Sequence, residues 1–266
     1  MFKSLWLRRF WPWSLGAGLL LAVVWLQGQR LQIMQSTDAQ PLPILQLQDQ
    51  RDQAQLLLRR RMPTFGYDNM IANWTFLNFL QYFGNMEVRG QLGYRLSPEF
   101  FEVIVDRDPR FFMPYLYMSS SISIYSGMPE RTVEIMDRGL AVMTPQIPEN
   151  SYFVWRNKAI DQLLFLGDSE GARQSFEIAA DWADQSNDPD VAQLSRQTAA
   201  FLAQNPSSRE AQISGWIQVA TNAVDDITFD LAIERLESLG AEILWAERGS
   251  VSVRYRTDDD EATPAD

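Results

Sequence analysis

The sequence predicts an all-α protein with an N-terminal transmembrane helix, an α-helical repeat domain, and a small C-terminal helix followed by a β-hairpin. Three observations predict this class. An apolar run follows basic residues at the start of the chain. The body then shows helical periodicity, with breaks that recur forty residues apart at Gly127 and Gly167. Alternation typical of strands occurs only beyond residue 240.

The apolar run at residues 10–26 predicts a membrane anchor. As a helix rising about 1.5 Å per residue it is roughly 25 Å long, just enough to cross the hydrocarbon of a bilayer. Because the basic residues Lys3, Arg8 and Arg9 precede the run, the positive-inside rule places residues 1–9 in the cytoplasm and the rest of the chain across the membrane. The residues expected to hold the anchor in the bilayer and at its interfaces are Trp11, Trp13, Leu19, Leu20, Leu21 and Trp25.

A cleaved secretory signal is the alternative interpretation of the same segment. The residues after Leu26 lack the small-x-small pattern of a cleavage site, and Trp25 and Gln27 are unfavourable beside a cut. The sequence therefore predicts an uncleaved anchor and a mature N-terminus near Met1.

Residues 27–47 predict an extended stalk. Glutamines recur through them, and Pro41 and Pro43 disfavour one continuous helix. A helix is expected over residues 48–61, ending before Pro63. Its terminal arginines, Arg59 to Arg61, complement the helix dipole, with contact to lipid headgroups as the alternative.

The domain at residues 48–225 continues with a helix over residues 67–83. Its apolar stripe includes Trp74, which predicts burial of Trp74 and argues against use of Asn73 as a glycosylation acceptor. A second helix is expected to open at Ser97, with Ser97 as N-cap and Pro98 in the first turn, and to end at Asp108.

The same helix, turn, helix arrangement is then repeated. The expected pairs are residues 111–125 with 130–143, and residues 152–166 with 170–183. A repeating unit of this size is typical of an α-solenoid, in which each helix pair buries its apolar face against its neighbours. An unrelated helical bundle is the alternative.

The repeats resemble tetratricopeptide repeats (TPR). Leu166-Gly167-Asp168 followed by Ala172, Phe176 and Ala179 is similar to the second-helix pattern of that family, and Thr132, Met136 and Gly139 repeat its spacing after Gly127. The resemblance covers about residues 67–188, with an insertion between Gly84 and Leu96. It implies protein binding on a concave surface lined by first helices. The partner-binding residues expected there are Tyr115, Tyr152 and Arg156.

The pattern changes toward the C-terminus. Residues 191–203 and 209–223 predict another helix pair. Residues 226–256 predict a helix ending at Gly240 and a hairpin with its turn at residues 247–250. Residues 257–266 predict an acidic, disordered tail.

Composition excludes most catalytic chemistry. The chain has no cysteine and no histidine, which removes thiolate nucleophiles, imidazole bases and most zinc, copper and haem ligation. We therefore expect no cofactor and no metal site. A net charge of −11, without a basic cluster of sufficient size, argues against binding to nucleic acid. Lys158 lies in a helical stretch and is expected to be solvated.

Carboxylate pairs leave one enzymatic alternative, a carboxylate-dependent hydrolase acting in the envelope. Such an enzyme needs only two acids at a suitable separation. No pair is favoured, and each fits a helix-surface or capping role. The candidate pairs are Glu99 with Glu102, Asp106 with Asp108, and Glu130 with Glu134.

The favoured function is a non-enzymatic, membrane-tethered scaffold that binds other membrane or envelope proteins as an assembly factor or accessory subunit. Its domain is expected on the periplasmic or thylakoid-lumen side. Anchored, glutamine-rich and lysine-poor chains with such repeats resemble cyanobacterial proteins, which implies a thylakoid location and a photosynthetic complex as partner.

Overall fold

The computed structural model describes residues 21–25, 27–28, 41–205, 209–247 and 249–254. The chain forms two compact units, Met1–Pro41 and Leu42–Asp266.

In the first unit, the described residues 21–25 and 27–28 are helical, and Leu21 and Trp25 are exposed. The rest of the expected anchor lies outside the described residues, as do residues 1–9 and 257–266. Among the described residues, no helix is both long enough and apolar enough to cross a bilayer. The anchor residues that the structure does not describe are Trp11, Trp13, Leu19 and Leu20.

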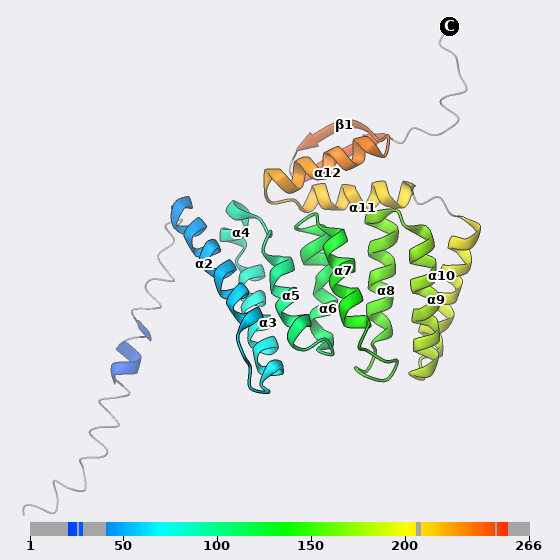
Figure 1. Ribbon diagram of the computed structural model, residues 1–266. Helices are drawn as coiled ribbons and strands as arrows, with labels where there is room; N and C mark the ends of the chain where they lie inside the picture. Colours follow the sequence, from blue (N-terminus) through cyan, green and yellow to red (C-terminus); the bar gives the residue numbers. More distant parts are fainter. Residues whose placement is uncertain (1–20, 26, 29–40, 206–208, 248, 255–266) are drawn as a thin grey trace, which may run out of the picture. The chain divides into compact units, whose positions relative to one another are not determined.

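The second unit is mostly helical and ends in a small antiparallel β-hairpin, which confirms this part of the predicted fold class (Figure 1). Its elements in chain order are α2 (Leu42–Arg61), α3 (Asp68–Gly84), α4 (Met86–Leu92), α5 (Ser97–Arg107), α6 (Phe112–Met118), η1 (Ser119–Ile124), α7 (Pro129–Leu140), α8 (Tyr152–Asp161), η2 (Gln162–Leu166), α9 (Ser169–Gln185), α10 (Pro189–Gln204), α11 (Arg209–Asn222), α12 (Asp226–Ser238), β1 (Glu242–Glu247) and β2 (Ser250–Arg254).

One helix boundary and one additional helix differ from what the sequence predicts. The helix expected over residues 48–61 begins at Leu42, so residues 42–47 are not part of an extended stalk. Pro43 is compatible with this start because the first turn of a helix needs no backbone donor there. The insertion between Gly84 and Leu96 contains α4, which was not predicted.

Aspartate side chains cap three of the later helices. Carboxylate oxygens of Asp168, Asp188 and Asp225 accept hydrogen bonds from backbone N–H groups at the starts of α9, α10 and α12, at 2.8, 3.2 and 2.9 Å. Such caps contribute about 1 kcal/mol each. The predicted cap at Ser97 is wrong: α5 includes Ser97, and its hydroxyl is buried without a partner among the described residues. Pro98 does lie in the first turn.

The helices from α2 to α10 form what we call the helical array. α3 packs on α5, the segment α6–η1 on α7, and the segment α8–η2 on α9, while α10 covers the outer side of α9. Figure 1 shows these helices side by side. Burial of each large apolar side chain contributes about 1.5–3 kcal/mol. Fully buried members of the main core are Phe79, Phe101, Ile104, Ile135 and Met136.

In two of the helix pairs, the first helix continues into a π-helical segment. α6 continues into η1, and α8 continues into η2. Periodicity in the sequence cannot distinguish such a segment from α-helix, and both were expected as plain helix. Asp161 lies where α8 meets η2 and is fully buried. The Ser119 hydroxyl of η1 donates to its carboxylate at 2.8 Å. Burial raises the pKa of Asp161 to about 7, against smaller opposing effects of hydrogen bonds from Ser119 and Ser123.

The C-terminal module, residues 209–254, packs across the turns of the helical array. Three glycines with positive φ mark these turns: Gly93, Gly127 and Gly167, at +68°, +63° and +68°. A Cβ at Gly93 would meet Asp225, one at Gly127 would meet Leu231, and one at Gly167 would meet Gln212. The module therefore covers all three turns at close range, and only glycine suits both the backbone and the space.

Candidate functional site

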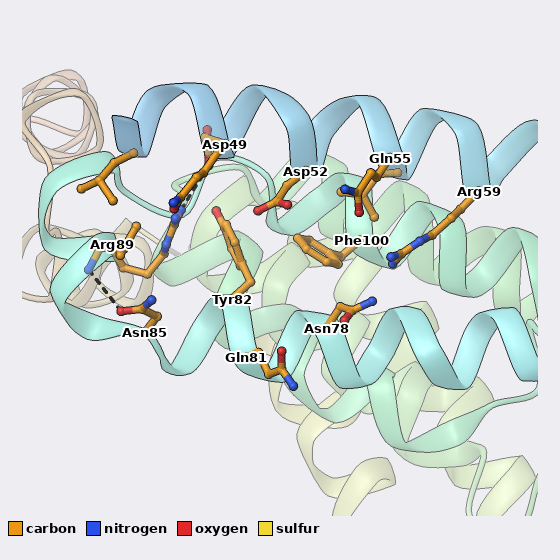
Figure 2. A pocket seen from close by; sticks show the side chains of 14 residues that line it. Asp49, Asp52, Gln55, Arg59, Asn78, Gln81, Tyr82, Asn85, Arg89 and Phe100 are labelled. Atoms are coloured by element: carbon orange, nitrogen blue, oxygen red, sulfur yellow. Dashed lines mark hydrogen bonds and ion pairs between the residues drawn. The ribbon is translucent and has the colours of Figure 1, made fainter. Parts of the chain in front are cut away.

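The most distinctive surface of the helical array lies at its N-terminal end, between α2 and α3. α2 packs mainly on α5 and α4, while α3 packs on α5. Between the two helices a cavity of about 240 Å³ opens, which we call the α2–α3 slot (Figure 2). Its floor is apolar and aromatic, formed by Leu56, Tyr82 and Phe100, and its walls are polar.

One end of the α2–α3 slot is closed by a buried ion cluster. The carboxylate of Asp49 accepts hydrogen bonds from Arg95 at 3.0 and 3.1 Å and from Arg89 at 3.5 Å. Arg89 also donates to the carbonyl of Gly93 at 2.8 Å, and its guanidinium lies 4.0 Å from the centroid of the Tyr82 ring. Burial raises the pKa of Tyr82 to about 12, so the phenol stays neutral. The cluster links α2 to α4 through Arg89 and to the loop between α4 and α5 through Arg95.

The middle of the slot holds two ionisable groups without a close partner. Neither the Asp52 carboxylate nor the Arg59 guanidinium forms an ion pair or hydrogen bond with any described side chain. Burial, and then repulsion from Asp49, raises the pKa of Asp52. Burial lowers the pKa of Arg59, with an opposing attraction from Asp52. Both shifts indicate partial desolvation inside the slot.

The slot also contains an uncharged polar group, the Asn78 amide. Its nitrogen is buried and lacks a hydrogen-bond partner among the described residues. An unsatisfied buried donor costs about 1–3 kcal/mol. In Figure 2 the Asn78 side chain lies on the α3 wall, across the slot from α2.

Beside the slot, α3 carries an exposed apolar stripe. Met70, Trp74 and Leu77 are 59%, 58% and 53% exposed, and Phe65 and Tyr67 extend the stripe into the preceding turn. Apart from Asp68, which pairs with Arg107 at 3.1 Å, none of the exposed residues of α3 is ionisable. The expected burial of Trp74 is therefore wrong. Large exposed apolar patches on folded proteins mark interaction surfaces.

The opposite end of the helical array is different. α10 exposes Asp190, Arg196 and several glutamines beside Leu194 and Phe201. Arg196 forms ion pairs with Asp184 and, at 3.5 Å, with Asp181. A polar outer face of this kind is typical of a capping helix, whereas α3 has no such cap.

The partner-binding residues expected from the sequence are not together on a surface. Tyr115 is fully buried, and its hydroxyl donates to the carbonyl of Pro109 at 2.8 Å. Tyr152 is 2% exposed and donates to Asp188 at 2.7 Å. The prediction that these tyrosines line an exposed surface is wrong, because hydrogen-bond acceptors inside the fold hold both of them. Arg156 is half-buried, 5.9 Å from the Phe153 ring centroid.

Two acids of the candidate carboxylate pairs, Glu102 and Asp106, have interhelical partners. Glu102, whose side chain is 9% exposed, accepts from Arg60 at 2.5 Å and also from Arg131. Asp106 accepts from Arg60 at 2.6 Å and from Arg138 at 2.8 Å. These arginines come from α2 and α7, so the two acids of α5 join three helices.

Of the other candidate groups, Glu99 is partly buried, and Glu130, Glu134 and Lys158 form ion pairs. Burial raises the pKa of Glu99. Glu130 lies 3.4 Å from Arg235, and Glu134 lies 3.5 Å from Arg131. Lys158 pairs with Asp137 at 2.5 Å. Within the part of the chain that the structure describes, no three acidic side chains are placed to hold a metal ion.

The slot was missed from the sequence, although a signal exists. Polar side chains that line the slot follow one another along α2 and α3 at steps of three and four residues, and amides recur among them. Comparisons of the chain with protein-family models, with curated proteins and with solved structures found no match.

Proposed function

We propose that the chain is a membrane-tethered, TPR-like scaffold that binds other membrane or envelope proteins, as an assembly factor or an accessory subunit of a membrane complex. The tether is the apolar segment at residues 10–26, which rests on sequence alone. The binding surface is the N-terminal end of the helical array.

One observation carries the proposal: the array exposes an uncharged, aromatic-rich stripe at one end, while its other end has a polar outer helix. In repeat proteins an uncapped end is insoluble unless another surface covers it. Trp74 and Met70 belong to residue types enriched in protein interfaces. Tethering raises the effective concentration of the stripe near other membrane proteins, so weak contacts suffice.

The proposal is tested by exchanging one exposed aromatic residue at each end. Trp74 and Phe201 are 58% and 62% exposed, and they form a matched pair for Trp74→Ser and Phe201→Ser. The full-length variants are purified from their membrane in gentle detergent, and co-purifying proteins are identified by mass spectrometry. We expect a recurrent membrane protein with the natural chain and with Phe201→Ser, but not with Trp74→Ser. Equal recovery with both variants, or no recurrent protein at all, would contradict the proposal.

A further inference from the structure

Two rows of side chains face each other across the α2–α3 slot. From α2 come Asp52, Gln55 and Arg59, and from the α3 side come Asn78, Gln81 and Asn85. Both rows advance by about one helical turn at each step, so each forms a ridge. The second ridge runs along α3 and ends at Asn85, just past the helix. The side-chain oxygen of Asn85 also accepts from the Val88 N–H at 3.4 Å. Figure 2 shows the two ridges with Tyr82 and Phe100 between them.

Carboxamides dominate these ridges, and this chemistry selects the ligand. A carboxamide presents a donor and an acceptor together, as a backbone peptide group does. An extended peptide has unpaired N–H and C=O groups along its length, and these need partners when they leave water. A helix has satisfied the same groups internally, so a helical partner would leave the amides of both ridges unmatched.

We propose that the α2–α3 slot binds a short extended segment of a partner protein through its main chain. The inference rests on the proposed function and deepens it, since it assigns the kind of segment that the partner contributes. In this arrangement the Asp52 carboxylate accepts from a backbone N–H, while Asn78 and Arg59 donate to carbonyl oxygens. The buried Asn78 nitrogen, unmatched in the free protein, gains its partner on binding.

The floor and size of the slot restrict the segment further. Leu56, Tyr82 and Phe100 form an apolar surface that suits an inward-facing apolar side chain. The cavity, about 240 Å³, is smaller than the roughly 300–1,000 Å³ typical of sites for drug-sized ligands, so it takes few side chains. Residues of the segment beyond the slot reach the exposed stripe of Met70, Trp74 and Leu77.

The charges that line the slot balance. The carboxylates of Asp49 and Asp52 are matched by the guanidinium groups of Arg59 and Arg89, and these two arginines act on the pKa of Asp52 against the effects of burial and of Asp49. A slot without net charge suits an uncharged main chain, which supplies acceptors for Arg59 and donors for Asp52.

The test uses short linear peptides selected by display against the full-length chain in detergent micelles. Each selected peptide is resynthesised with one backbone nitrogen methylated at a time, which removes an N–H and leaves the side chain unchanged. We expect methylation at one or two central positions to weaken binding about tenfold, the loss of one or two main-chain hydrogen bonds. The variants Asn78→Leu and Gln81→Leu should weaken it similarly, while Gln197→Leu on α10 should not.

Circular dichroism and thermal melting establish that each variant is folded, and because Gln81 is exposed its variant serves if Asn78→Leu fails to fold. Binding that tolerates methylation at every position, or that survives both slot variants, would overturn the inference, as would failure to select any peptide. These outcomes leave the Trp74→Ser test untouched, so the failure of this inference is distinguishable from failure of the proposed function.

Discussion

Gly139 of α7 lies directly against the phenol ring of Tyr115 of α6, and no space remains between them for a side chain. The hydroxyl of Tyr115 is held by the carbonyl of Pro109, so the ring cannot retreat. The small residue was expected from the repeat spacing, but the identity of its neighbour was not.

Replacement of Gly139 by alanine should therefore destabilise the helical array. The added methyl group would overlap the Tyr115 ring, and overpacking of a buried contact costs about 1–3 kcal/mol. Gly90→Ala is the matched control, because Gly90 lies in α4 with nothing within 4 Å of the added atom. There the change should be neutral or stabilising by up to about 1 kcal/mol. Urea unfolding followed by circular dichroism measures both. An equal response of the two variants would contradict the contact.

The buried carboxyl of Asp161 should make stability depend on pH. Its folded-state pKa is about 7, whereas an unfolded aspartate has a pKa of about 3.9. Between these values the unfolded chain has released the proton that the folded chain retains. The contribution of Asp161 is thus fully present below about pH 4 and is lost as pH rises toward 7, at up to about 1.4 kcal/mol per pH unit.

Asp161→Asn isolates this effect, since the amide does not ionise. Thermal melting at several pH values between 4 and 8 should show the natural chain losing stability relative to Asp161→Asn as pH rises. Parallel curves for the two proteins would show that Asp161 does not titrate in this window.

Glu102 should act as a structural ion-pair partner. Glu102→Gln removes the charge that faces Arg60 and Arg131 and should destabilise the fold by about 1–3 kcal/mol, since Glu102 is buried but its arginines are partly exposed. Glu134→Gln is the control, because Glu134 is exposed and should change stability by less than about 0.5 kcal/mol. Chemical unfolding measures both. Full stability of Glu102→Gln, with loss of a hydrolytic activity on envelope polymers, would instead favour the hydrolase alternative.

Trp216 should anchor the C-terminal module to the array. It is 1% exposed, and its indole N–H donates to the carbonyl of Phe165 at 3.3 Å. Trp216→Ala should cost about 3–5 kcal/mol. Trp245 on β1 is 49% exposed, so Trp245→Ala should cost less than about 1 kcal/mol. Calorimetry should give one unfolding transition for the natural chain. A second transition at low temperature, unchanged by Trp216→Ala, would show a module that folds independently.

The sequence predicted most helices and the hairpin within a few residues, because their apolar periodicity and their breaks are local features. It did not predict which face of α3 is buried. The apolar residues of α3 surround the helix, so Trp74 and Phe79 look alike until the neighbouring helices are known. Tyr115 and Tyr152 were misplaced for the same reason: their acceptors, Pro109 and Asp188, are brought to them only by tertiary packing.

For the α2–α3 slot the sequence holds only part of the signal. Spacing shows that Asp52, Gln55 and Arg59 share one side of α2, but not that Asn78 faces them. That depends on how α2 lies against α4 and α5, where Asp49 pairs with Arg89 and Arg60 pairs with Glu102.

The cover over Gly93, Gly127 and Gly167 has a consequence for biosynthesis. Residues 209–254 are translated after every helix whose turns they cover. A ribosome that has completed α10 has therefore produced the whole array while its three turns are still open to solvent. Nascent chains at this stage would be the most vulnerable to proteases and to association with one another, and arrival of the C-terminal module would end that interval.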